Sequence, residues 1–226
     1  SMDVTTATQM QRTIRAFNPD PVPDATIREV IELAKQAPSN GNTQPWNIAV
    51  VSGEAKDQVK EAILDEISSG VKPYPAFPAG GRGLHGAYKE RQRACGYKYY
   101  ASMDVDREDS QGRQDLMMRN YDFFGAPHAA FLSYPETMHR ANAIDMGIFL
   151  QSLMLLFVER GIQGCPQGAL ATYPGPVKRL LPIPEDNAIL CGFSFGYPDY
   201  KAKINSAKMG RELFDSFASI ISKITT

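Results

Sequence analysis

The sequence predicts a mixed fold, α/β or α+β, in a single domain. Three apolar runs suited to short strands, at 47–53, 126–134 and 187–197, lie between longer segments in which apolar residues recur with helical spacing. The 226 residues are 43% hydrophobic and 10% aromatic, which is enough for one sizeable core. Helices are therefore expected to outnumber strands, and the strands to be spread along the chain.

Two helices are expected before the first strand. Residues 3–12 are compatible with a weakly patterned helix, and a proline-spaced turn follows at 18–24. Residues 25–37 carry apolar side chains at i, i+3, i+4 and i+7, which is the face of an amphipathic helix. Asp24 or Thr26 could cap this second helix, and Thr26 has a glutamate three residues on, as in a capping box.

The middle of the chain is expected to hold helices around an irregular segment. Residues 55–68 have helical spacing, whereas 70–86 are rich in proline and glycine and predict an irregular surface segment. Residues 87–120 return to a helical pattern, with a charged break at 104–112. We therefore expect one helix, then an irregular surface segment, and then two helices separated by the charged break.

The second half contains the most apolar run of the chain. A helix is predicted at about 140–160, and its core "MGIFLQSLMLLFV" is shorter than the ~20 residues that a membrane span needs. We therefore expect a buried core helix. An amphipathic helix is predicted at 211–224.

Charge and cysteine content exclude several classes of protein. The 24 basic and 25 acidic residues are mixed along the chain and give a net charge of −1, which argues against a nucleic-acid partner. Cys95, Cys165 and Cys191 form no CxxC pair, so a reducing, cytoplasmic compartment is expected. Residues 1–15 lack the apolar stretch of a signal peptide, and Ser1–Met2 is read as an expression-vector remnant. No membrane partner is expected.

Two familiar motifs occur in contexts that do not support them. Gly81, Gly83 and Gly86 satisfy G-x-G-x-x-G, but the three prolines before them are unsuited to the parallel strand which that fingerprint needs. Residues 192–196 satisfy G-x-S-x-G, but a proline follows, and every histidine precedes the serine. The histidine spacing and the carboxylates at 104–115 match no metal site. Neither metal nor nucleophilic catalysis is therefore predicted.

Three segments carry groups suited to an anionic cofactor. Segments 11–17 and 205–211 combine arginine, lysine and a hydroxyl, the donors that bind a phosphate. Loop 38–44 adds neutral amide donors and acceptors, which suit a ligand with carbonyl and imide edges. Each cluster alone is more often a solvated polar face. The charged and hydroxyl residues of the two basic segments are Arg12, Thr13, Arg15, Lys208 and Arg211.

Taken together, these motifs resemble the nitroreductase family of FMN-dependent oxidoreductases. The likeness runs in order through "RTIRAFNPDPVP", "APSNGNTQPWNIAVVSG", "RNYDFFGAPHAAFL", "AIDMGIFLQSLMLLFVERGIQGCPQGAL" and "GYPDYKAKINSAKMGR", and so covers nearly the whole chain. The "FFGAP" and "CPQGAL" versions look most like the nitrobenzoate-reductase branch. The resemblance implies one α+β domain over 1–226, with a central, mostly antiparallel sheet flanked by helices. It also implies an intertwined homodimer with two FMN molecules at its interface.

The resemblance assigns roles to the three segments. Segment 11–15 would lie beside the FMN phosphate and ribityl chain, and the basic pair near the C-terminus would complete the phosphate site. Loop 38–42 would reach the FMN of the other subunit, and the backbone of 166–168 would face the flavin ring near N5. The loop carries no charge, in keeping with a buried interface where an unpaired charge is costly. The residues implied for cofactor binding are Arg12, Thr13, Arg15, Pro38, Ser39, Asn40, Asn42, Pro166, Gln167, Gly168, Lys208 and Arg211.

One position departs from the family pattern. Many relatives carry an arginine where this chain has Gln11, and Arg12 could reach round to substitute for it. Gln151, inside the apolar run, could face the flavin or bond across the interface. Trp46 is expected to pack in the core.

The implied activity is ping-pong electron transfer from NADH or NADPH to a nitroaromatic or quinone-like acceptor, with the flavin carrying the chemistry. A cation such as Arg15 would stabilise the reduced flavin near N1, and no side chain is expected to act as general acid or base. Tyr121, Phe123 and Phe124 could line the pocket. Two alternatives remain: other flavin chemistry on the same fold, such as a dehalogenase or an oxidase, and a flavin-binding or redox-sensing module without turnover.

Overall fold

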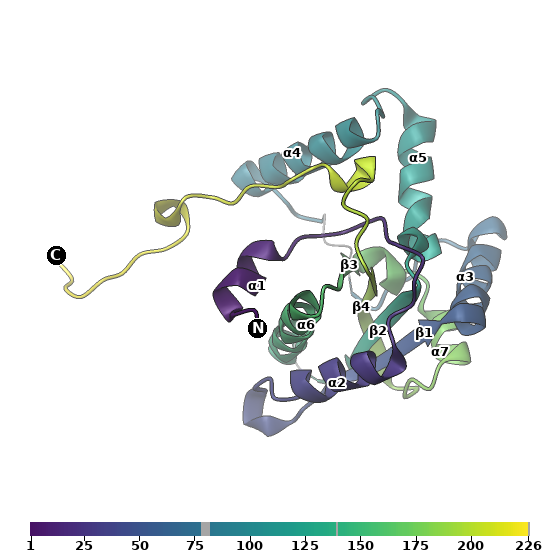
Figure 1. Ribbon diagram of the computed structural model, residues 1–226, viewed down its shortest axis with the longest axis horizontal. Coiled ribbons are helices and arrows are strands. Elements are labelled where there is room, and N and C mark those ends of the chain that lie inside the picture. The colour runs from purple at the N-terminus through teal and green to yellow at the C-terminus, as the bar shows by residue number, and fades with distance from the viewer. Residues whose placement is uncertain (78–81, 139, 226) are drawn as a thin grey trace.

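The computed structural model describes residues 1–77, 82–138 and 140–225. In these residues a four-stranded sheet has the order β1-β2-β4-β3, and every neighbouring pair is antiparallel (Figure 1). This confirms the α+β fold with a central antiparallel sheet, because an α/β fold would need parallel strands. The strands are β1 Asn47–Ser52, β2 His128–Pro135, β3 Gln163–Gln167 and β4 Asn187–Gly196.

The helices predicted from apolar spacing are present in the first two thirds of the chain. The charged break separates α4 from α5 as predicted. The irregular segment at 70–86 is confirmed over 70–77 and 82–85, whereas 78–81, with Gly81 of the G-x-G-x-x-G match, lies outside the described residues. The α-helices in the described residues are α1 Val4–Met10, α2 Asp24–Ala34, α3 Gly53–Ser68, α4 Gly86–Ser102, α5 Ser110–Met118, α6 Asn142–Glu159 and α7 Pro174–Leu180.

The start of α2 differs from the predicted cap. Pro23 occupies the N-cap position, and no side chain makes a capping hydrogen bond there. The helix begins at Asp24, two residues before Thr26, so neither residue is the cap. Asp24 lies instead in the first turn, where a negative charge interacts favourably with the helix dipole.

The central strand β2 is buried on both faces of the sheet. Leu132 and Tyr134 belong to the apolar cluster that includes α2 and α6, whereas Ala129 and Phe131 belong to the cluster that includes α3 and α7. Successive side chains of a strand point to opposite faces, which explains this division. The sequence of this strand is therefore a continuous apolar run, without the alternation of apolar and polar residues that a strand with one exposed face shows.

Helix α6 supports the first of these clusters. Met146, Phe149, Leu153 and Phe157 are each at most 3% exposed, and the ring of Phe157 stacks on that of Phe195 with centroids 4.6 Å apart. Within the described residues, α6 alone has the length and apolar composition of a membrane span. The buried row of side chains shows that it is a core helix, as predicted.

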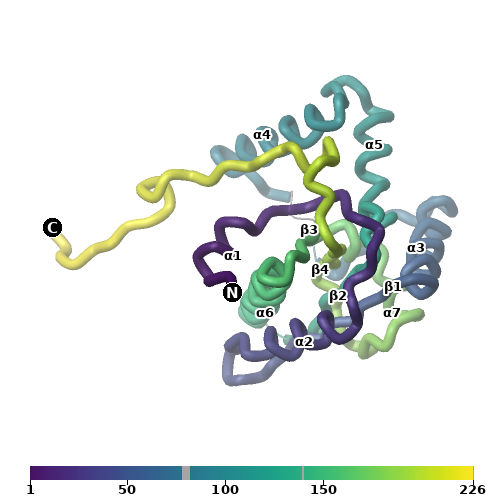
Figure 2. The backbone as a smooth tube through the Cα atoms, in the orientation of Figure 1, coloured from purple at the N-terminus to yellow at the C-terminus, as the bar shows by residue number. Residues whose placement is uncertain are grey.

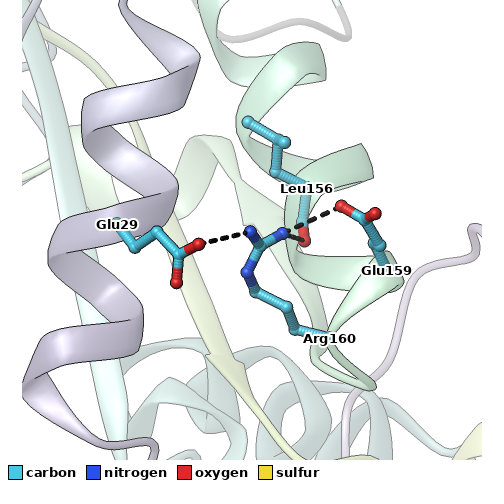
Figure 3. Close-up of polar contacts among 4 residues, drawn as sticks. All are labelled: Glu29, Leu156, Glu159 and Arg160. Carbon is cyan, nitrogen blue, oxygen red and sulfur yellow. Dashed lines mark hydrogen bonds and ion pairs between the residues drawn. The ribbon is translucent and has the colours of Figure 1, made fainter. Parts of the chain in front are cut away.

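Helices α2 and α6 are joined by Arg160, the residue that follows α6 (Figure 3). One terminal nitrogen of its guanidinium, Nη2, donates to Oε1 of Glu29 in α2 at 3.0 Å. The other, Nη1, donates to the carbonyl of Leu156 at 2.9 Å and to Glu159 at 3.0 Å. Arg160 thus satisfies one of the carbonyls that a helix end leaves without a partner, and it holds the two helices side by side.

The predicted helix at 211–224 is wrong. Residues 211–225, here called the C-terminal arm, are extended apart from a single 3₁₀ turn at Phe214–Ser216, and they leave the body of the molecule (Figures 1 and 2). An amphipathic helix this short needs a surface on which to bury its apolar face, and no such surface covers the apolar side chains of the arm in the described part of the chain. Its apolar side chains are 52 to 89% exposed, namely Leu213, Phe214, Phe217, Ile220, Ile221 and Ile224.

Candidate functional site

A cavity of about 780 Å³ opens between α1, the segment that follows α1, and residues 207–211. We call it the basic cavity. It is lined by all five residues that the two basic segments contribute, Arg12, Thr13, Arg15, Lys208 and Arg211. The structure therefore brings together two segments that lie nearly the whole length of the chain apart.

The basic cavity has an uncompensated positive charge. None of the described residues that line it is acidic, and its three arginines and one lysine form no ion pair with an acidic side chain of the described residues. Cations gathered in a concave site raise the local concentration of anions. The donor set, guanidinium and ammonium groups with the Thr13 hydroxyl, is suited to a phosphate.

Arg12 fixes the geometry of the cavity. Its guanidinium donates to the carbonyl oxygens of Asn205 and Ala207, the latter at 3.3 Å, and its backbone N–H donates to Oε1 of Gln163 at 2.9 Å. These bonds hold the turn that leads to Lys208 against the segment after α1.

Asn205 connects the same two segments from within. Its side chain is 3% exposed; Oδ1 accepts from the backbone N–H of Arg15 at 2.8 Å, and Nδ2 donates to the carbonyls of Ala16 and Asp199 at 3.0 and 2.8 Å. The sequence alone did not single out Asn205 and Gln163, because a polar residue in a short stretch without clear apolar spacing carries no signal of burial.

Gln11 lines the cavity but is paired within the chain. Its amide and that of Gln151 exchange two hydrogen bonds, at 3.1 and 2.8 Å. Gln151 therefore bonds to a residue of its own chain that lines the cavity. The positive charge of the cavity comes from Arg12, Arg15, Lys208 and Arg211 alone.

The loop after α2 does not line the basic cavity of its own chain. Pro38, Ser39, Asn40 and Asn42 follow α2 in the chain, and Asn40 lies near the start of α6. The backbone N–H of Asn40 donates to Oδ1 of Asp145 in α6 at 3.1 Å.

The end of this loop is held by Trp46. Its ring stacks on that of Phe149 of α6 at 5.0 Å between centroids, which confirms the expected packing of the only tryptophan.

The backbone of this loop is held in an unusual conformation. Gly41, Asn42 and Gln44 all have φ between 49° and 59°, the left-handed region. Asparagine tolerates this region better than most residues, and glycine adopts it freely. Oγ of Ser39 accepts from the N–H of Gln44 at 3.0 Å, and the Gln44 amide donates to the carbonyl of Asn42 at 3.1 Å. The loop is thus braced by its own side chains.

Residues 166–168 form a third group at the end of β3, outside the lining of the basic cavity. The Gln167 side chain is buried; Nε2 donates to the carbonyl of Asn120 at 3.0 Å and Oε1 accepts from the Ser194 hydroxyl. Pro166 is exposed and Gly168 opens a 3₁₀ turn. Only backbone and proline surface are therefore available to a ligand at 166 and 167.

The nucleophilic and basic groups near the sheet are inert. Burial raises the pKa of the Cys165 thiol to about 11, so it stays protonated at neutral pH. His128 accepts from the N–H of Val22 on Nε2 at 2.8 Å, which leaves the proton on Nδ1, 2.5 Å from the Ser52 hydroxyl. A ring that donates to this serine cannot act as its base. No group of three metal-ligating side chains lies close together in the described residues.

Comparison with known proteins agrees with this geometry. Residues 9–197 match the model of the nitroreductase family. Nitroreductase NfnB of Mycolicibacterium smegmatis is 39% identical over 201 residues, 89% of this chain and 85% of its own length. The 4-nitrobenzoate reductase of Pseudomonas putida is 36% identical over 208 residues, 92% of this chain and 90% of its own. The chain belongs to the nitroreductase family.

Solved structures agree on the fold. The FMN- and NADPH-dependent nitroreductase NfnB of a Sphingopyxis strain superposes with a TM-score of 0.94 at 34% identity, covering 98% of this chain and all of the other. The M. smegmatis NfnB structure in complex with NADPH has a TM-score of 0.91 at 36% identity, covering 97% and 100%. The resemblance to the family, including its nitrobenzoate-reductase branch, is confirmed.

Proposed function

We propose that this chain is an FMN-dependent oxidoreductase that passes electrons from NADH or NADPH to nitroaromatic or quinone-like acceptors by a ping-pong mechanism. The observation that carries the proposal is the basic cavity, which joins four cations and a hydroxyl with no acidic residue in its lining. The relatives support it, because they are described as an FMN-dependent nitroreductase in complex with NADPH and as a 4-nitrobenzoate reductase.

The residues present fit FMN. The volume of about 780 Å³ lies within the usual range of ligand pockets, ~300–1,000 Å³. The phosphate of FMN would be held by Lys208, Arg211 and Arg12. The Thr13 hydroxyl would donate to the end of the ribityl chain that carries the phosphate, and Arg15 would lie closer to the flavin ring. FMN, when bound, supplies the hydride and electron transfer, and the protein supplies position and electrostatics.

The proposal includes a homodimer. The C-terminal arm exposes six large apolar side chains, and Ile144 and Ile148 of α6 are 65 and 37% exposed. Apolar surface of this extent indicates a protein interface, and a second copy of the chain is the occupant that makes a closed, symmetric assembly. Pro38, Ser39, Asn40 and Asn42 would then contact the partner's cofactor, since they do not reach the basic cavity of their own chain.

Two smaller parts complete the proposal. Residues 1–226 would form one FMN-binding domain, with Pro166, Gln167 and Gly168 presenting backbone to the ring. The location would be cytoplasmic, in keeping with three cysteines that are all free thiols.

The test is a visible absorption spectrum of the purified protein titrated with FMN, followed by NADH and NADPH oxidation with a nitroaromatic or a quinone. A shifted flavin spectrum at about one FMN per chain and acceptor-dependent oxidation are expected. Bound FMN without oxidation of either donor would favour the redox-sensing alternative. No bound flavin with FMN in excess would overturn the proposal.

Two substitutions test the assigned site. Arg15→Ala and Lys208→Ala should each raise the Kd for FMN by about 10- to 100-fold, since a hydrogen bond to a charged group contributes ~1.5–3 kcal/mol. Lys201→Ala, a lysine on the same C-terminal segment that does not line the cavity, is the matched control and should leave the Kd unchanged. Unchanged affinity in both test variants would contradict the assignment of the basic cavity to FMN, because Lys208 is assigned to the phosphate and Arg15 to the ring.

A further inference from the structure

Two aromatic rings from different elements converge on Arg15. Its guanidinium carbon lies 4.4 Å from the ring centroid of Tyr99, in α4, and 5.9 Å from that of Phe124, in the 3₁₀ segment Arg119–Gly125. Both distances are within the ~6 Å at which a cation is attracted to the face of a ring. We call Tyr99 and Phe124 the aromatic clamp.

The clamp separates the roles of the two arginines near the start of the chain. The guanidinium of Arg12 is bound to backbone carbonyl oxygens. That of Arg15 donates to no oxygen of the described residues, and its other polar neighbour is the buried thiol of Cys165. Stacking covers the faces of a guanidinium and leaves its N–H edges available. Arg15 is thus held by the two rings and by a hydrogen bond with the Cys165 thiol, and its remaining N–H groups donate to no oxygen of the described residues.

The backbone is strained where it places Phe124. Phe123 and Phe124 have φ values of 56° and 51°, and Gly125 follows at 69°, so three successive residues are left-handed. For a bulky residue this region costs about 1–3 kcal/mol. Phe123 is explained by the core, because it is fully buried with its ring edge-on to Phe131 at 6.3 Å. Glycine would make the same turn at position 124 without strain. The presence of a phenylalanine there must therefore be explained by a contact that its ring makes.

That reason is a small apolar cluster beneath Arg15. Phe124, Leu116, Cys165 and Ile204 are buried together, and Tyr99 packs against them. The cluster is separate from the two clusters that cover the sheet. It supports the clamp from α5, from β3 and from the segment leading to Lys208, and the last of these continues into the lining of the basic cavity.

We propose that Tyr99 and Phe124 are positioning residues that hold the Arg15 guanidinium in the plane from which its N–H groups meet the flavin ring of FMN. This inference rests on the proposed function. Without the clamp, Arg15 would adopt several side-chain conformations, and FMN binding would have to order them. Because Arg15 stabilises negative charge, the clamp favours reduced over oxidised FMN.

The experiment compares Tyr99→Leu with Tyr99→Phe, which keeps the ring, and with Tyr97→Leu, an exposed tyrosine of α4 with no contact to Arg15. The readouts are the Kd for FMN from flavin fluorescence and the midpoint potential of the bound flavin. Tyr99→Leu should weaken FMN binding about 3- to 10-fold and make the potential more negative. A tenfold change in preference between the two oxidation states corresponds to about 30 mV for two electrons. Tyr99→Phe and Tyr97→Leu should match the wild type.

A double-mutant cycle with Arg15→Ala makes the test independent of folding. Under the proposal, Tyr99→Leu has little further effect once Arg15 is removed, because the ring acts through the guanidinium. If Tyr99→Leu weakened FMN binding equally in the presence and in the absence of Arg15, the clamp would be overturned. A wild-type protein that binds FMN, with Tyr99→Leu unchanged in Kd and potential, would overturn the clamp and leave the proposed function intact. Failure of the wild type to bind FMN would overturn both.

Discussion

The backbone N–H of Asn40 donates a hydrogen bond of 3.1 Å to Oδ1 of Asp145, a carboxylate that is only 4% exposed. The other oxygen of Asp145 accepts from Asn142 of the same helix at 3.3 Å. A buried carboxylate with so few donors depends strongly on each of them. The position of the loop after α2 is therefore coupled to the core helix α6.

Asp145→Asn should free this loop. The amide loses the charge-assisted bond to Asn40, so we expect a loss of about 1–3 kcal/mol in the free energy of unfolding. The backbone N–H of Asn40 should exchange with solvent faster, by a larger factor than the loss in the free energy of global unfolding alone would cause. Asp65→Asn, an exposed residue of α3, is the control and should stay within about 0.5 kcal/mol of the wild type. Unaltered exchange at Asn40 would contradict the anchoring role.

Acidification should destabilise the fold through His128. Burial lowers the pKa of this imidazole below its usual 6.5, and the nearby Lys56 lowers it further. Below pH 6.5 the unfolded chain therefore binds more protons than the folded chain, and the free energy of unfolding falls with pH until the folded pKa is passed. Urea unfolding between pH 8 and pH 5 measures the effect. In His128→Gln the free energy of unfolding should depend less steeply on pH over this range, whereas His85→Asn should match the wild type. The same pH dependence in the wild type and both variants would be evidence against the assignment of the effect to His128.

Gly164→Ala should damage both the fold and the site. A Cβ at this position would lie 2.7 Å from the ring of Phe193 and would overlap the carbonyl oxygen of Ser194. The carbonyl of Gly164 also accepts from the N–H of Ile14 at 3.0 Å, so a shift of β3 moves the segment that carries Arg15. We expect a loss of about 3 kcal/mol in unfolding free energy and weaker FMN binding.

The control for Gly164→Ala is Gly96→Ala in α4. A Cβ there meets only the Tyr100 ring, at an ordinary 3.7 Å, so stability should hold or rise by up to ~1 kcal/mol. Comparable losses in both alanine variants, measured by denaturant unfolding, would show that steric overlap is not the cause.

Ile220→Asp combined with Ile221→Asp should weaken the dimer. Both side chains lie on the C-terminal arm at 89 and 70% exposure, so charges there cost the isolated chain nothing in packing. If the arm lies on a second copy, the charges are buried in the interface and the molar mass from light scattering should fall toward that of one chain at low concentration. Lys223→Asp on the same arm serves as the comparison. A mass that stays at two chains in the double variant would exclude this part of the arm from the interface.

The sequence predicted the elements whose apolar spacing is strong and missed those that tertiary contacts create. β3 was missed because "QGCPQ" contains a glycine and a proline, yet Pro166 is tolerated on an edge strand, where one side of the ladder is free. α7 was missed because "PGPVKRL" reads as a turn, although proline suits the first position of a helix. The prediction for the arm is wrong because an amphipathic pattern alone does not make a helix: in the described residues the apolar side chains of the arm stay exposed, with no surface to bury them.

The candidate site divides in the same way. The residues proposed to bind the phosphate could be named because the family motifs carry them in order, and the structure gathers Arg12 and Lys208 in one cavity. The residues that orient them could not be named. Tyr99 and Asn205 become neighbours of Arg15 only through folding, and nothing in their local sequence distinguishes them from other tyrosines and asparagines.

The basic cavity combines residues 8–15 with residues 207–211, so almost the whole chain separates its two walls. During synthesis the first wall leaves the ribosome long before the second. A nascent chain can form its early helices first, and under the proposed function the phosphate site is completed only when residue 211 has emerged. Under the proposed function, retention of FMN therefore reports that the segment after α1 and residues 207–211 have come together.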